Sequence, residues 1–141
     1  MLEHRETAEK IKNIYQIDDT FPITDEKYDN WLKKLLNKTE DEVDENDVYT
    51  MFSQHELEDL AIKKAISFII EDPLAGEMWD GQFLEQLAKE PIEKLSAYKA
   101  QLKELTTYIE QNIDESMWDF DFERDEIMEG YDEFRRAVSK L

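Results

Sequence analysis

The stretch EDPLAGEMWDGQFLEQL, residues 71–87, holds two of the three glycines and one of the three prolines in this 141-residue chain. Strand-and-turn architectures need many such residues, whereas helices tolerate few of them. With so little glycine and proline elsewhere, the rest of the chain is suited to form long helices. We therefore expect a helical protein whose backbone irregularity is concentrated in one corner.

Apolar side chains recur at helical spacing along most of the chain, and 40% of its residues are apolar, which is enough for a packed core. The widest apolar stripe marks residues 54–72 as the central helix. Thr24 is expected to cap the second helix, and Val43 to be buried. The fold class predicted is all-α, an irregular bundle of about six or seven helices forming a single domain over residues 1–141. The helices are expected over 6–17, 25–37, 46 or 47 to 52, 54–72, 81–89, 91–113 and 127–138.

Several classes of site are disfavoured by the residues themselves. The chain has no cysteine, and its two histidines, His4 and His55, lack the spacing of a metal site. No glycine-rich phosphate loop occurs, and the acidic run at residues 40–47 lacks the glycine of a calcium loop. We expect no catalytic residues, no metal and no cofactor, and so no enzyme. With neither a signal peptide nor a membrane-spanning run visible, a cytoplasmic location is expected.

The formal net charge of −19 is the most unusual overall property. A field of that sign repels nucleic acid and membranes and attracts basic proteins. Six of the eight residues in 40–47 are acidic, and residues 114–133 hold ten acidic residues against one basic residue, Arg124. Both segments can be solvated faces over aromatic core residues, or contact surfaces in which aromatic anchors sit within an acidic rim. The candidate partner-binding residues are Glu40, Asp41, Glu42, Asp44, Glu45, Asp47, Asp114, Glu115, Trp118, Asp119, Phe120, Asp121, Phe122, Glu123, Asp125 and Glu126.

The irregular corner itself favours a structural role. Pro73 is expected to end the central helix and Gly76 to allow a turn with positive φ. Asp80 is expected to cap the following helix, and Trp79 to pack the turn onto the core. The residues of this motif are Asp72, Pro73, Gly76, Glu77, Trp79, Asp80 and Gly81.

Residues 31–90 resemble the helical immunity proteins of bacterial contact-dependent growth inhibition systems. The resemblance lies in a K-T entry followed by a D-V pair, and in a helix that ends in D-P-x-A-G-E, an aromatic residue and D-G-x-hydrophobic-L. Leu74 departs from the aromatic residue expected after Pro73. The matching residues are Lys38, Thr39, Val43, Asp47, Val48, Asp72, Pro73, Ala75, Gly76, Glu77, Trp79, Asp80, Gly81, Phe83 and Leu84.

This resemblance implies an inhibitor that binds the C-terminal toxin domain of a cognate secreted effector inside the producing cell. Such toxins are often nucleases, whose basic surfaces an acidic partner can cover. The alternatives are an acidic DNA mimic that inhibits nucleic-acid-binding proteins broadly, and an enzyme that uses paired carboxylates. No direct contact with nucleic acid or membrane is expected.

Overall fold

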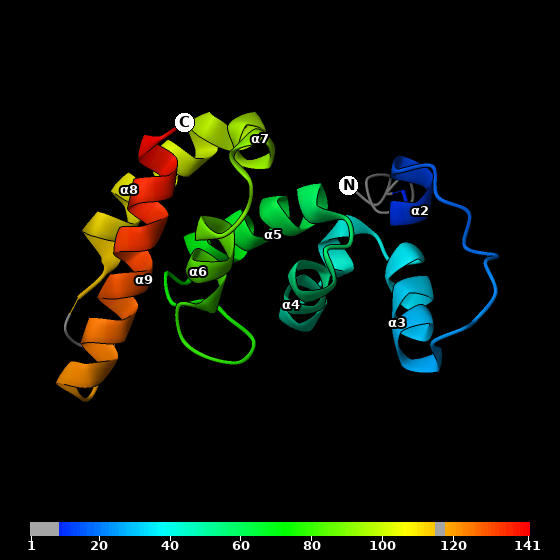
Figure 1. Cartoon of the computed structure of the whole chain (residues 1–141), viewed down its shortest axis with the longest axis horizontal. Coiled ribbons are helices and arrows are strands. Elements are labelled where there is room, and N and C mark those ends of the chain that lie inside the picture. The colour runs from blue at the N-terminus through cyan, green and yellow to red at the C-terminus, as the bar shows by residue number, and fades with distance from the viewer. Residues whose placement is uncertain (1–8, 115–117) are drawn as a thin grey trace, which may run out of the picture. The chain divides into compact units, whose positions relative to one another are not determined.

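The computed structural model describes residues 9–114 and 118–141, and these residues are almost entirely helical (Figure 1). Within these ranges there is no strand, only an isolated bridge between Lys10 and Thr39. Six α-helices have seven residues or more, and two others are single turns, which confirms the predicted all-α class. The chain divides into two compact units, Met1–Asp47 and Val48–Leu141. The single-domain organisation stays a prediction.

The first unit holds α2 (Ile11–Ile14), α3 (Glu26–Leu36), a 3-10 turn (Glu40–Glu42) and the first turn of α4 (Glu45–Gln54). The residue that caps α3 is Asp25, whose carboxylate accepts from the Tyr28 N–H at 3.1 Å. The prediction for Thr24 was wrong, because the Thr24 N–H donates instead to the Asp29 carboxylate at 2.8 Å. Val43 is buried, as predicted.

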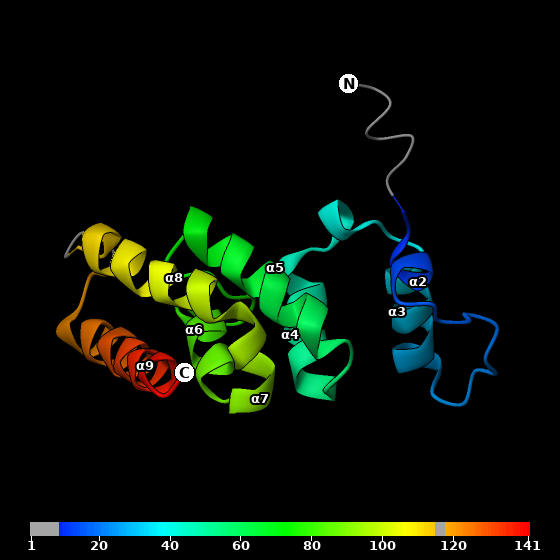
Figure 2. The same cartoon turned by 90° about the horizontal axis from the view of Figure 1, so that it is seen from above.

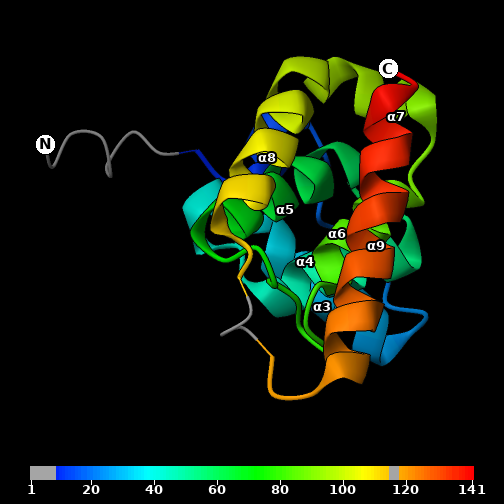
Figure 3. The same ribbon diagram turned by 90° about the vertical axis from the view of Figure 1, so that its left-hand side faces the viewer.

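The second unit is built around α5 (Glu58–Glu71) and contains α6 (Gln82–Ala88), α7 (Ile92–Leu95), α8 (Lys99–Asn112) and α9 (Asp121–Ser139). α6 packs along α9, and α5 packs against α6 and α8. Figures 1 and 2 show α8 and α9 side by side, and in Figure 3 both stand in front of α5 and α6. The core consists of the predicted stripes, including Leu60, Ala65 and Ile69 of α5 and Phe83 of α6.

Several helix boundaries differ from the sequence prediction. Of the helix expected over 6–17, the described residues form only the single turn Ile11–Ile14, and the central helix expected over 54–72 begins at Glu58, after His55 and Leu57 with positive φ. The single helix expected over 91–113 is interrupted by a 3-10 turn at Ser96–Tyr98. There the Ser96 hydroxyl donates to the Ile92 carbonyl at 2.8 Å, a bond that competes with regular helix geometry. The last helix begins at Asp121, six residues before Ile127, so residues 121–126 of the acidic segment are helical, whereas residues 118–120 are not. In the described ranges, no helix is both long and apolar enough to cross a membrane.

Candidate partner-binding surfaces

The acidic ridge, residues 40–47, connects the end of α3 to the start of α4. Thr39 and Glu42 form a reciprocal capping box around the 3-10 turn. Hydrogen bonds from the Thr39 N–H, and then from its hydroxyl, hold the pKa of Glu42 below its usual value. The ridge is therefore locally rigid while its carboxylates face solvent. The exposed members are Asp41, Glu42, Asp44 and Glu45, and Glu40 is half-buried.

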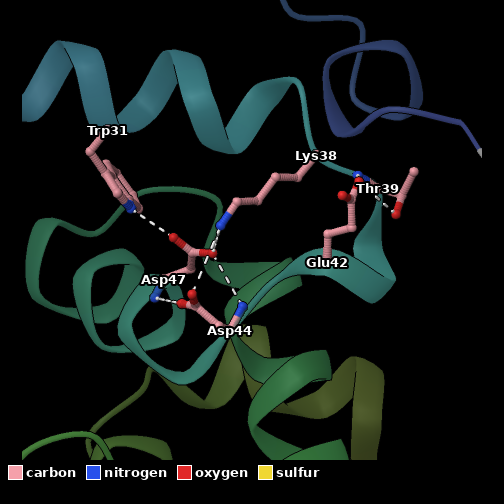
Figure 4. A network of polar contacts seen from close by, with 6 residues as sticks. All are labelled: Trp31, Lys38, Thr39, Glu42, Asp44 and Asp47. Carbon is pink, nitrogen blue, oxygen red and sulfur yellow. Dashed lines mark hydrogen bonds and ion pairs between the residues drawn. The ribbon is translucent and has the colours of Figure 1, made fainter.

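Asp47 lies inside the fold, unlike the rest of the ridge, and is only 4% exposed (Figure 4). One carboxylate oxygen accepts from the Trp31 indole N–H at 3.0 Å, and the other is 2.6 Å from the Lys38 ammonium. Asp44 and Asp47 also accept from each other's backbone N–H, which caps α4. Asp47 is thus a structural residue of the first unit, and we leave it out of the surface proposed below.

The same cluster stabilises the charged form of Lys38. Burial alone would lower the pKa of Lys38, but the hydrogen bond to Asp47 and the charges of Asp47 and Asp44 raise it above its usual value. Three motif residues therefore have physical roles here: Lys38 and Asp47 pair, and Thr39 caps. The K-T and D-V elements join the end of α3 to the start of α4.

The C-terminal acidic segment, residues 114–126, carries two exposed aromatic rings. Phe120 and Phe122 are 59% and 62% exposed, and their rings stack with centroids 5.5 Å apart. Of the two interpretations of these rings, the one that places them in the core is therefore wrong, and their contact with a partner stays a prediction. Trp118 is half-buried. Glu115 lies outside the described residues. The exposed carboxylates of the segment belong to Asp114, Asp119, Asp121, Asp125 and Glu126, and Glu123 is half-buried.

The corner between α5 and α6 is held by a glutamine that the sequence motif leaves unspecified. Gln82 is fully buried, and its Oε1 accepts from the backbone N–H groups of Glu77 and Met78 at 2.9 and 2.8 Å. α5 ends at Glu71, just before Pro73, as expected. The two glycines differ from prediction in their roles. Gly81 has the positive φ, +80°, whereas Gly76 allows the Trp79 and Gln82 backbones to approach closely.

Two other expectations for the corner were wrong. Gly81, not Asp80, is the N-cap of α6, and no side chain caps this helix. Trp79 is 53% exposed, because its indole N–H reaches outward to the Glu85 carboxylate at 2.8 Å instead of packing into the core. Glu77 and Asp80 are exposed. The corner therefore presents an indole ring at the surface rather than burying it.

A carboxyl pair lies where α5 meets the segment before α7. Burial, followed by the hydrogen bond with Glu58 and the charge of Glu58, raises the pKa of Glu90 to about 7. Lys94 pairs with Glu58 and, mainly through that hydrogen bond, lowers the pKa of Glu58. His55 also contacts Glu58, at 3.3 Å. Burial and the neighbouring Glu58 therefore favour the protonated form of Glu90 in the folded protein.

Replacing Glu90 by glutamine should stabilise the protein more at pH 8.5 than at pH 5.5. The folded-state pKa of Glu90 lies above its unfolded value, so the folded state binds the extra proton and loses stability as pH rises from about 4.5 to 7. An amide at this position keeps the hydrogen bond to Glu58 without the charge. We expect Glu90→Gln to gain about 1–2 kcal/mol more at pH 8.5 than at pH 5.5, measured by urea unfolding.

The control for this measurement is Glu93→Gln, which removes the same charge from an exposed neighbouring position. Its effect on the free energy of unfolding should vary little between the two pH values. Equal pH profiles for the two variants would show that Glu90 does not hold its proton in the folded state.

Among the described residues, no group of three or more metal-ligating side chains converges on a point. What the structure does present is exposed carboxylates on both units and an exposed aromatic pair, features typical of a surface that binds another protein. Fold and surface together are those of an acidic, helical binding protein.

A profile of the CDI immunity proteins matches residues 13–105, more than half of the chain. The chain belongs to this family, the immunity proteins of contact-dependent growth inhibition. The family neutralises toxins by binding and is in general not enzymatic. No curated protein and no solved structure matches the chain. The matched range includes the acidic ridge and the corner and ends within α8, so α9 and the aromatic pair lie beyond it.

Proposed function

We propose that this protein neutralises a basic nuclease toxin domain by covering its cationic working surface. Membership of the family implies that the partner is a cognate toxin. The proposal that this toxin is a basic nuclease rests on charge. A protein of net charge −19 attracts a cationic surface and competes there with the phosphate backbone of nucleic acid. Such inhibition requires no chemistry from the immunity protein.

The observation that carries the proposal is the exposed aromatic pair within a rim of carboxylates. Phe120 and Phe122 together expose a large apolar surface, although burying each ring would be favourable by about 1.5–3 kcal/mol. Aromatic anchors inside a polar rim are the usual source of binding energy in protein interfaces. The pair lies beyond the matched range, as expected of a surface that selects one toxin rather than maintaining the shared fold.

The acidic ridge supports the same mechanism from the first unit. Its exposed carboxylates are held in place by the capping box and by the Asp44–Asp47 hydrogen bonds, so their field is directional rather than averaged over many conformations. We propose that the ridge mainly speeds association with the toxin, because exposed charges act over distance. This effect should weaken as salt screens the charges.

The proposal is tested with the C-terminal toxin domain of the cognate effector. That domain should cleave DNA or RNA, and an equimolar amount of this protein should stop the cleavage. A toxin domain that this protein binds but that cleaves neither nucleic acid would contradict the nuclease assignment. Equal inhibition of unrelated DNA-binding enzymes would favour the DNA-mimic alternative instead.

Replacing both exposed rings should weaken toxin binding without unfolding the protein. We expect Phe120→Ser with Phe122→Ser to raise the dissociation constant on the order of 30- to 100-fold, mostly through faster dissociation, because the buried apolar area is lost. Surface plasmon resonance measures both rates. The control is Ile70→Ser, which removes an exposed apolar side chain from α5. A double variant that binds like this control would exclude the pair from the interface.

A further inference from the structure

A second candidate site lies within the second unit, between α4, the corner and α6. It is a cavity of about 400 Å³, in the size range of ligand pockets. Three aromatic side chains line it: Tyr49 and Phe52 from α4 and Trp79 from the corner. The polar lining that matters here comes from Gln82, Gln86 and Glu90. The cavity therefore combines ring surfaces with polar groups.

Those same three polar residues carry unsatisfied atoms. In the part of the chain that the structure describes, the buried side-chain atoms without a hydrogen-bond partner are Gln82 Nε2, Gln86 Oε1 and Glu90 Oε2. The orientation of the Gln82 amide is set, because its Oε1 accepts from two backbone N–H groups. Its Nε2 must then face away from them. Buried polar atoms without partners are rare and costly, and here all three belong to residues that line one cavity.

The unsatisfied atoms define what that ligand must offer. Gln86 Oε1 is an acceptor, and Glu90 Oε2 is one when Glu90 is ionised, so together they need a group with several N–H donors. A guanidinium group carries five donors in a plane, stacks on aromatic rings and pairs with carboxylates. Glu85 and Lys89, which carry opposite charges, line the same cavity. Gln82 Nε2 is a donor and needs an acceptor, such as a backbone carbonyl of the same ligand.

We propose that this cavity binds an arginine-bearing segment of the cognate toxin. The guanidinium occupies the aromatic cavity beside Gln86 and Glu90, and a carbonyl of the segment accepts from Gln82. This inference rests on the proposed function in that it takes the toxin as the source of the segment. It adds a second contact, separate in sequence from the aromatic pair, and assigns it a specific side-chain chemistry.

The first test needs no toxin. The protein, labelled with nitrogen-15, is titrated with N-acetyl-arginine N-methylamide while the Gln82 and Gln86 side-chain amide signals are followed by NMR. We expect both signals to shift saturably, with an affinity on the order of millimolar for so small a ligand. The lysine counterpart and the uncharged citrulline counterpart should bind more weakly. Shifts of equal size with citrulline, or none with arginine, would overturn the assignment.

The second test uses the toxin domain and the variant Gln86→Met, which removes an acceptor while keeping the length of the side chain. Losing a hydrogen bond to a charged group should raise the dissociation constant roughly tenfold or more. The matched control is Gln101→Met, at an exposed position of α8, which should bind like the parent. Binding should be measured by calorimetry together with the thermal stability of both variants.

The two proposals fail in different ways. If the parent binds and inhibits the toxin but Gln86→Met is as tight as Gln101→Met, the arginine site is wrong and the proposed function stands. If the parent does not inhibit a nuclease toxin, the proposed function is wrong, and the arginine titration still reports on the cavity by itself.

Discussion

Asp47→Ala should lower the free energy of unfolding by about 4 kcal/mol, which is the largest effect expected from a single substitution in this chain. The change leaves the half-buried Lys38 ammonium without its 2.6 Å partner and the Trp31 indole N–H without an acceptor. It also removes one half of the reciprocal cap of α4. Urea unfolding followed by circular dichroism measures the loss.

The control is Asp41→Ala, which removes an exposed carboxylate from the same acidic ridge. A surface substitution of this kind should change stability by no more than about 0.5 kcal/mol. If the two variants are equally stable, the Asp47 cluster does not hold the first unit together. We expect Asp47 to make no direct contact with the toxin, because its carboxylate is buried. Its replacement would weaken toxin binding only by disturbing the fold.

Gly76→Ala should destabilise the protein by about 3 kcal/mol. A Cβ atom at this position would lie 2.3 Å from the Trp79 carbonyl oxygen and 2.7 Å from Gln82 Cβ, so backbone has to move. Overpacking that side chains cannot relieve is at the costly end of its range. The same movement would disturb the Gln82 amide and its bonds to Glu77 and Met78.

Gly81→Ala is the matched comparison for this prediction. Its φ of +80° is strained for alanine, but no atom lies within 4 Å of the added Cβ. The cost should be about 1 kcal/mol, from backbone conformation alone. Thermal unfolding of the two variants side by side separates close approach from positive φ. A Gly76 variant no less stable than the Gly81 variant would contradict the role assigned to Gly76.

The residues that hold the fold together differ from those proposed to bind the toxin. Several of the motif residues that resemble the family support the fold: Lys38 and Asp47 form an ion pair, and Gly76 allows a close approach of backbone. The exposed aromatic pair lies outside the matched range. A shared scaffold with separately varied surfaces lets related inhibitors keep one fold while discriminating between toxins.

Features that depend on local spacing could be predicted from the sequence. Helical periodicity marked the core stripes of α5 and α6, because a helix brings residues three and four apart onto one face whatever surrounds it. The burial of Val43 and the end of α5 before Pro73 also followed from local chemistry. The acidic character of the two candidate surfaces required only counting.

Tertiary structure alone decided which of those side chains are accessible and which are paired. Asp47 looks like its acidic neighbours in the sequence, yet it is buried because Trp31 and Lys38, 16 and 9 residues earlier, supply its donors. Trp79 looks like a core residue, yet it is exposed because Glu85 offers its N–H an acceptor outside. Nothing in the sequence pattern marks Gln82 as important. Its role is to accept hydrogen bonds from two backbone N–H groups, which come within reach only in the folded corner. Periodicity is a property of one helix, whereas a hydrogen-bond partner is a property of the whole arrangement.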